Sequence, residues 1–291
     1  MNTPENFDLN ETAAAPLTIQ PPYEGPFAGL HPVLGLLLAF ATWAASVLLL
    51  FLPQLFALPY IALHYRDQRP TLEALLADKT VIVILVAGIL PAHLITLAVA
   101  WAIVTRFGKI PLGNALRWGA ENRIGLAKNI FLGVLLFAAS WAIVFVLGGK
   151  ETELERVINS SRTAALLIAF MAVATAPLVE EIIYRGVLFP AWQRLTGSVT
   201  AVVIVTLMFA LPHVPQYWPN MAVIFSIAIL SAALTIVRAR TGRLLPCYII
   251  HLVFNGTQAL LIVAEPYLRG LGHPPEPKTA PAIIHSLLSL F

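Results

Sequence analysis

The stretch Val179-Glu180-Glu181-Ile182-Ile183-Tyr184-Arg185-Gly186 places two carboxylates and a guanidinium inside an otherwise apolar run, which begins near Thr163 and continues to about Trp192. A charged side chain at the centre of a membrane-spanning helix costs about 2.5–3.5 kcal/mol on insertion scales. The three charges of this stretch are therefore expected to pair with one another or to line a cavity.

Helical spacing separates the roles of these three groups. Glu181 and Arg185 are four residues apart with the acid first, which is the favourable order for an ion pair along one helix face. Glu180 lies about 100° further round, on the face that carries Tyr184 and Pro177. Pro177 should kink the helix one turn before the acids, because it cannot donate a hydrogen bond to the carbonyl four residues earlier. A carboxylate without a partner at such a kink suits general-base chemistry.

The composition of the whole chain indicates a polytopic membrane protein. Of its 291 residues, 58% are hydrophobic and only 11% are charged, whereas soluble domains carry about 25% charged residues. The formal net charge is +3 and the 18 basic residues form no stripe, so the expected partners are membrane lipids and not nucleic acid. The single cysteine, Cys247, excludes an internal disulfide and is interpreted as a small buried side chain.

The chain is expected to have three parts. Residues 1–30 contain four acidic and no basic residues, which predicts a flexible acidic tail and not a secretory signal peptide. Residues 31–265 form the integral membrane domain. Residues 266–291 are expected to form a Pro-rich linker and a short amphipathic helix, in which five apolar residues share one face: Ile283, Ile284, Leu287, Leu288 and Phe291.

Seven apolar runs predict the fold class. They cover about 33–56, 80–104, 130–147, 163–189, 199–211, 221–237 and 244–264. A helix needs about 20 such residues to cross the hydrocarbon core, so the fifth run reaches only about two-thirds of the way before Pro212 interrupts it. Its end should therefore lie within protein or a water-filled cavity. Basic and apolar residues between 106 and 128 predict an interfacial amphipathic stretch. We expect an all-α, polytopic transmembrane helix bundle of seven or eight spans around a central polar cavity.

Two further polar pairs lie at membrane depth. Phe209-x-x-x-His213 closes the fifth run and His251-x-x-x-Asn255 lies in the middle of the seventh. In each pair the spacing places both side chains on one helix face, and Gln258 extends the second face. Each pair alone fits a structural role. Polar groups from three separate spans cannot all face lipid, however, so we expect them to meet.

Two other residues of the spans have structural interpretations. His93, near Pro91 in the second run, is read as a histidine satisfied inside the bundle. Gly256 is expected to let a neighbouring helix approach closely, because it has no side chain.

The polar groups together supply hydrolytic chemistry. A carboxylate and a neutral imidazole can hold and deprotonate a water molecule, and a second imidazole with a carboxamide can donate N–H groups to a tetrahedral oxyanion. Apart from Cys247, which lies one turn before His251 without a recognisable motif, no serine, cysteine or lysine adjoins them in a nucleophile-with-base pattern. Water is therefore the expected nucleophile.

The three motifs Glu180-Glu181-x-x-x-Arg185, Phe209-x-x-x-His213 and His251-x-x-x-Asn255, in this order on successive membrane segments, resemble the signature motifs of the CPBP family. This family contains type II CAAX prenyl endopeptidases together with bacteriocin-processing and abortive-infection relatives. The resemblance covers about residues 110–265. It implies a bundle of about eight transmembrane helices around a cavity open toward one side of the membrane, and glutamate-dependent endoproteolysis without a cofactor.

The resemblance also implies a role for each motif residue. Glu180 would be the base that activates water and His213 its partner, while His251 and Asn255 would form the oxyanion hole. Two further residues would orient and neutralise the site, namely Glu181 and Arg185.

The resemblance also bears on the surroundings of the site. It implies that Phe209 packs in the cavity wall, and two residues that share helix faces with the motif residues are expected in the same wall, namely Tyr184 and Gln258. The implied partner is a peptide or protein substrate of open identity, in this family one that can be lipidated at its C-terminus. The implied location is the bacterial cytoplasmic membrane, in which the chain would be an integral multi-pass protein.

Three other interpretations stay open. Two histidines and one glutamate match the ligand count of a His₂Glu catalytic zinc site, although no His-Glu-x-x-His run occurs and Arg185 would repel a cation. A non-catalytic binding or immunity protein would use the same polar groups to hold helices together or to bind a peptide. A proton-coupled transporter would use the intramembrane Glu and His residues as a relay.

Overall fold

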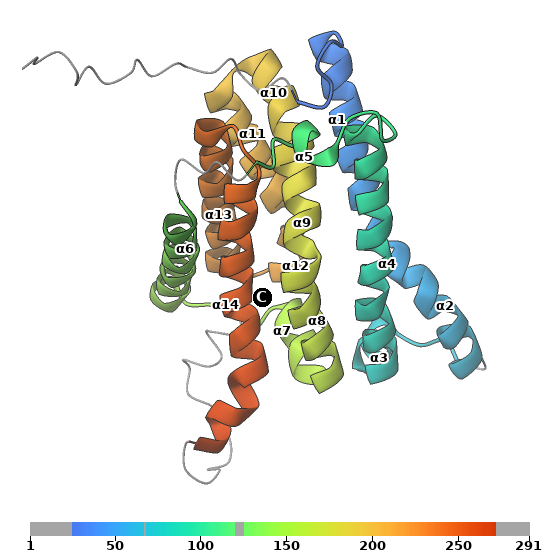
Figure 1. Cartoon of the computed structure of the whole chain (residues 1–291). Coiled ribbons are helices and arrows are strands. Elements are labelled where there is room, and N and C mark those ends of the chain that lie inside the picture. Colours follow the sequence, from blue (N-terminus) through green and yellow to red (C-terminus); the bar gives the residue numbers. More distant parts are fainter. Residues whose placement is uncertain (1–24, 67, 120–124, 272–291) are drawn as a thin grey trace, which may run out of the picture.

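The fold of the chain is a helix bundle (Figure 1). The computed structural model describes residues 25–66, 68–119 and 125–271, and within these ranges every regular element is a helix. Six helices are long and apolar enough to cross a membrane, and a bent pair makes a seventh candidate span. The predicted all-α polytopic bundle is confirmed, and the lower of the two expected span counts, seven, is reached when the bent pair is counted as one span.

The described elements begin and end as follows. The first half of the chain contains α1 (Pro32–Leu49), α2 (Leu52–His64), α3 (Leu72–Ala77), α4 (Lys79–Val104), α5 (Leu112–Ala115) and α6 (Leu126–Leu147). The middle contains α7 (Glu153–Ser160), α8 (Arg162–Ala174), α9 (Ala176–Glu180), the π-helix η1 (Glu181–Leu188) and α10 (Phe189–Thr196). The last part contains α11 (Ser198–Ala210), the 3-10 turn η2 (Leu211–His213), α12 (Val214–Tyr217), α13 (Met221–Thr241) and α14 (Leu245–Leu271).

The broken span formed by α8 to α10 lies between α4 and α14 (Figure 1). Its two halves meet at a bend of 40°, with Thr175 as the residue between α8 and α9. Pro177 lies in the first turn of α9, where its missing N–H and its ring end the straight course of α8. The kink predicted from Pro177 is confirmed.

The fifth apolar run is longer than expected. Pro212 does not end the helix, because it lies in the first turn of η2, where a proline needs no backbone partner. The chain tightens into one 3-10 turn and continues as α12, so the segment from Ser198 to Tyr217 has 20 residues and qualifies as a span. The expectation of a span that reaches only two-thirds of the bilayer is therefore wrong.

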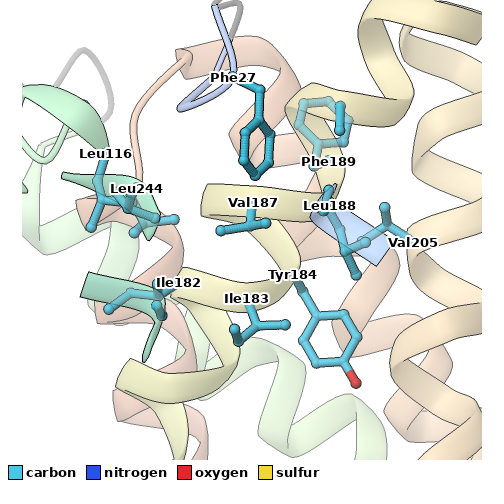
Figure 2. Packing of buried hydrophobic residues seen from close by; sticks show 14 of the residues in the cluster. Phe27, Leu116, Ile182, Ile183, Tyr184, Val187, Leu188, Phe189, Val205 and Leu244 are labelled. Atoms are coloured by element: carbon cyan, nitrogen blue, oxygen red, sulfur yellow. The ribbon is translucent and has the colours of Figure 1, made fainter. Parts of the chain in front are cut away.

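The largest apolar cluster of the described residues surrounds η1 (Figure 2). Ile183, Val187 and Leu188 project from η1 into it, and each is at most 2% exposed. Leu116 and Leu244 close the cluster from the loops that precede α6 and α14. This packing fixes the π-helix, and with it the charged residues of the same segment, at the centre of the bundle.

The last part of the predicted acidic tail is not a tail. Residues 25–30, called the strap below, pack on the bundle, and Figure 2 shows Phe27 directed into the cluster around η1. The guanidinium of Arg194 donates to the carbonyls of Phe27 and Leu30, at 3.1 and 3.2 Å. That of Arg106 donates to the carbonyl of Ala28 at 2.6 Å. Burial of the apolar Phe27 side chain holds the strap on the bundle, although the first 30 residues as a whole are acidic. Residues 1–24 lie outside the described part of the chain.

Two other expectations are only partly covered by the structure. In the stretch 106–128, for which an interfacial amphipathic segment was expected, the described residues form turns, the short α5 and the start of α6, and residues 120–124 lie outside the described ranges. The segment 266–291 begins as the end of α14, which continues to Leu271 and not to a linker at Glu265. The predicted amphipathic helix near the C-terminus lies outside the described residues.

Close helix contact occurs at Gly133 of α6 and not at Gly256 of α14. A Cβ atom at Gly133 would lie 2.8 Å from the carbonyl oxygen of Ile250 and from Cβ of Val253 on α14. One at Gly256 would meet nothing within 4 Å, so the prediction of a close approach there is wrong. The close spacing of α6 and α14 therefore depends on Gly133 of α6, and not on Gly256 of α14.

Gly133→Ala is expected to lower the free energy of unfolding by about 1–3 kcal/mol, because a methyl group must displace backbone at this contact. Gly256→Ala is the matched control, and it should leave the free energy unchanged or raise it by up to about 1 kcal/mol, since alanine favours helix. Thermal unfolding of both variants in detergent checks the difference. Equal effects of the two substitutions would contradict the assignment.

Candidate active site

The two adjacent glutamates have different surroundings, and the helix type changes between them. Glu180 is the last residue of α9, and Glu181 is the first residue of the π-helix η1. The side chains of Glu181 and Arg185 are 0% exposed, whereas that of Glu180 is 23% exposed. π-Helical turns are rare and frequently occur at functional sites.

The expected ion pair between Glu181 and Arg185 is present, with 2.9 Å between Nη1 and Oε1. Helix α13 supplies further partners for the guanidinium, which donates to Ser231 Oγ at 2.9 Å, to the Ser231 carbonyl at 3.0 Å and to Thr235 Oγ1 at 3.3 Å. The guanidinium carbon lies 4.7 Å from the centre of the Phe209 ring, within the range of a cation–π contact. A buried charge pair needs such additional hydrogen bonds to offset its desolvation.

His251 bridges the two glutamates. Its Nδ1 lies 2.8 Å from Glu181 Oε1 and its Nε2 lies 3.5 Å from Glu180 Oε2. Because a carboxylate oxygen only accepts, Nδ1 donates to Glu181, and the same oxygen also accepts from Arg185. The ring of His251, which is 2% exposed, is thereby fixed in orientation with Nε2 toward Glu180.

His213 has one defined tautomer when it is neutral. Its Nδ1 lies 2.7 Å from the carbonyl oxygen of Phe209, which has no proton to give, so Nδ1 donates. Nε2 is then the nitrogen that can accept a proton. The imidazole stacks on the Phe209 ring at a centroid distance of 4.9 Å. The i, i+4 spacing of this motif thus serves both a stacking contact and a hydrogen bond.

Asn255 contacts the bend between α8 and α9. Its Nδ2 donates to the carbonyl of Ala172 at 3.0 Å. The carbonyl four residues before Pro177 is that of Val173, and the one that Asn255 engages is one residue earlier. The carboxamide has two N–H donors, so this bond leaves a second one for another acceptor.

A cavity of about 420 Å³ connects these groups. Its wall contains four of the six candidate catalytic residues, Glu180, His213, His251 and Asn255. All three expected wall residues also line it: Phe209, Tyr184 and Gln258. Glu181 and Arg185 are not part of the wall, so they lie behind the cavity and contact it through His251 and Phe209. A volume of this size falls in the range of ligand pockets.

Four polar contacts of this region were not foreseen. His93 of α4 lines the cavity and shares a 2.7 Å hydrogen bond between its Nδ1 and Thr175 Oγ1. The indole N–H of Trp43 donates to the Tyr184 hydroxyl at 3.2 Å. Ser231 and Thr235 support Arg185, and their i, i+4 spacing in an apolar helix is a signal that sequence inspection could have used.

The remaining ionisable candidates do not gather around a metal position. Within the described ranges, no three His, Cys, Asp or Glu side chains form a group that could hold a metal ion. Cys247 is buried and its thiol donates to the carbonyl of Leu234 at 3.3 Å, which agrees with its interpretation as a small buried side chain.

Comparison with known proteins identifies the segment that builds the site. Residues 162–257 match the family model described as type II CAAX prenyl endopeptidase Rce1-like. The search of curated proteins and the search of solved structures gave no match. The matched segment is about a third of the chain and contains all six candidate catalytic residues. This segment of the chain is thus similar to type II CAAX prenyl endopeptidases, and the described residues contain six or seven candidate membrane spans, as a multi-pass membrane protein has.

Proposed function

We propose that the protein is an intramembrane endopeptidase in which Glu180 and His213 activate water and His251 and Asn255 stabilise the oxyanion. The observation that carries the proposal is the convergence of these four side chains, from three separate spans, on one cavity of about 420 Å³. The geometry of His251 between the two glutamates supports it, since ionisable groups at membrane depth are retained where they have a function.

Glu180 suits the role of base better than Glu181. Its carboxylate lies at the cavity and is partly exposed, and its contact with His251 Nε2 is long, at 3.5 Å. The carboxylate of Glu181 is held at one oxygen by both Arg185 and His251. Its side chain is 0% exposed and is not part of the cavity wall, so a water molecule in the cavity does not reach it. Glu181 therefore orients His251 and does not take a proton from water.

In the proposed reaction, Glu180 takes a proton from a water molecule, and the oxygen of this water attacks the carbonyl carbon of the substrate. The unprotonated Nε2 of His213 accepts a hydrogen bond from the same water and orients its lone pair. The C–N bond then breaks, and the proton held by Glu180 passes to the leaving nitrogen. The products are a carboxylic acid and an amine, so atoms and charges balance.

The developing oxyanion requires N–H donors. The second N–H of Asn255 is available for this role, because only one is used by the Ala172 carbonyl. When both ring nitrogens of His251 carry protons, Nδ1 donates to Glu181 and Nε2 is free to donate to the oxyanion. Removal of one such donor typically costs about 10²–10³-fold in kcat.

The proposed substrate is a membrane-associated peptide or protein, lipidated at its C-terminus as in the family that the segment 162–257 matches. The proposed location is the bacterial cytoplasmic membrane. We propose that no metal is required, because Arg185 places a fixed positive charge beside the carboxylate that a zinc ion would need.

The test is a comparison of membrane peptidomes from cells that carry the native chain and cells that carry Glu180→Gln. New fragment ends should occur only with the native chain, and they identify the cleaved protein and bond. Cleavage should persist in a chelator. Identical peptidomes would favour a binding or immunity protein, and cleavage lost with chelator but restored by zinc would favour the metal mechanism.

A further inference from the structure

We propose that His93 is a positioning residue, which fixes the bend between α8 and α9 through Thr175 and thereby places the carboxylate of Glu180. This inference rests on the proposed function, because it concerns the geometry of the proposed base. His93 belongs to α4, outside the segment 162–257 that matches the family model, so the match assigns it no role.

The contact lies at the hinge of the broken span. Thr175 is the residue between α8 and α9, and its backbone angles, φ −123° and ψ −42°, depart from helical values. Nδ1 of His93 lies 2.7 Å from Thr175 Oγ1, and the imidazole is 8% exposed. Thr175 Oγ1 lies 3.4 Å from the Met171 carbonyl, a long contact within its own helix. The shorter bond therefore joins the hinge to α4.

The bend is held from two other helices. On α4, His93 holds the hydroxyl of Thr175, and on α14, Asn255 holds the carbonyl of Ala172, three residues earlier. Both α4 and α14 also pack along α8 and α9. Two hydrogen bonds from two neighbouring helices determine the direction in which α9 leaves α8.

Glu180 is connected to this hinge by one short helix. Helix α9 has five residues, from Ala176 to Glu180, so the carboxylate follows any change in the direction of the bend. Its distance of 3.5 Å from His251 Nε2 leaves little room for such a change. A misplacement of about 1 Å can cost about a hundredfold in rate. His93 lines the same cavity as Glu180, but its defined contact is with the hinge.

Two pairs of substitutions separate positioning from direct participation. His93→Asn keeps a polar atom near the position of Nδ1, which contacts Thr175, and has none near Nε2. His93→Gln does the reverse: it has a polar atom near Nε2 and none near Nδ1. Thr175→Ser keeps the hydroxyl group, and Thr175→Val removes it with little change in shape. The measurements are kcat, KM and the pH profile of the purified full-length chain, with the peptide found in the peptidome comparison.

His93→Gln and Thr175→Val should each lower kcat about a hundredfold with little change in KM and with the same pH profile. His93→Asn and Thr175→Ser should restore most of the activity. The double variant His93→Gln/Thr175→Val should be no slower than either single variant, because both remove the same bond. Melting temperatures of all variants check that the bundle is folded.

Loss of activity in His93→Asn together with full activity in Thr175→Val would overturn the inference, since His93 would then act on the reacting atoms through Nε2. Full activity in all variants would also overturn it. An experimental structure of Thr175→Val tests the role of the hydrogen bond without an activity measurement. The inference requires that the bend between α8 and α9 in this variant differ from the 40° of the native chain, and an unchanged bend would overturn it. Unchanged cleavage in Glu180→Gln would refute the proposed function instead, and the bend of Thr175→Val would still decide the role of His93.

Discussion

Arg185→Met is expected to lower the free energy of unfolding by about 3–5 kcal/mol, the largest effect on stability that we predict. The substitution keeps an apolar side chain of similar length but leaves the carboxylate of Glu181 buried without a cation. Both side chains of the native pair are 0% exposed, so water cannot solvate the remaining charge. Unfolding of the purified protein in detergent, by heat or denaturant, measures the effect.

Two controls make this prediction specific. Arg156 pairs with Glu153 at 2.8 Å, but both side chains are at least half exposed, so Arg156→Met should cost no more than about 1 kcal/mol. In the second control, Glu181→Gln is added to Arg185→Met, which removes the unpaired charge and should recover part of the loss. A similar small effect for Arg185→Met and Arg156→Met would show that the buried pair is not a main determinant of stability.

Glu180→Gln should lower kcat/KM by about 10²–10⁴-fold while the melting temperature stays within a few degrees of the native value. Glutamine keeps the shape of the side chain and can still form a hydrogen bond, but it cannot take a proton from water. The side chain is partly exposed at the cavity, so its neutralisation removes little packing. The measurement uses the purified full chain and the peptide identified by the peptidome comparison.

Glu73→Gln is the matched control, because Glu73 lies exposed in the first turn of α3 and does not line the cavity. It should keep native activity and stability. Activity within about threefold of native for Glu180→Gln would remove the carboxylate from the mechanism. A large loss of stability in this variant would assign Glu180 a structural role.

Local features of the sequence predicted the spans and one pair of the site. Apolar length alone located seven spans, because each span must be long enough to cross the membrane whatever its neighbours are. The pair of Glu181 and Arg185 followed from their spacing within one helix. The kink at Pro177 followed from the missing N–H of proline. In each case the cause lies within the same span as the effect.

Features that depend on distant residues could not be read in the same way. His251 contacts Glu181 across 70 positions of sequence, and helical periodicity carries no information about that distance. The π-helix η1 was not predicted, because hydrophobic periodicity does not distinguish one π-helical turn within a longer helix. The continuation of the helix beyond Pro212 depends on a 3-10 turn, which a proline permits but does not require.

The strap formed by residues 25–30 sets an order of events during biosynthesis. Its Phe27 carbonyl accepts a hydrogen bond from Arg194, which follows 167 positions later in the chain. The ribosome therefore produces α1 long before the groups that hold the strap exist. The first span must therefore enter the membrane before the strap is held, and the strap gains its contacts in two steps: first with Arg106, and then with Arg194 after η1 and α10 have been made.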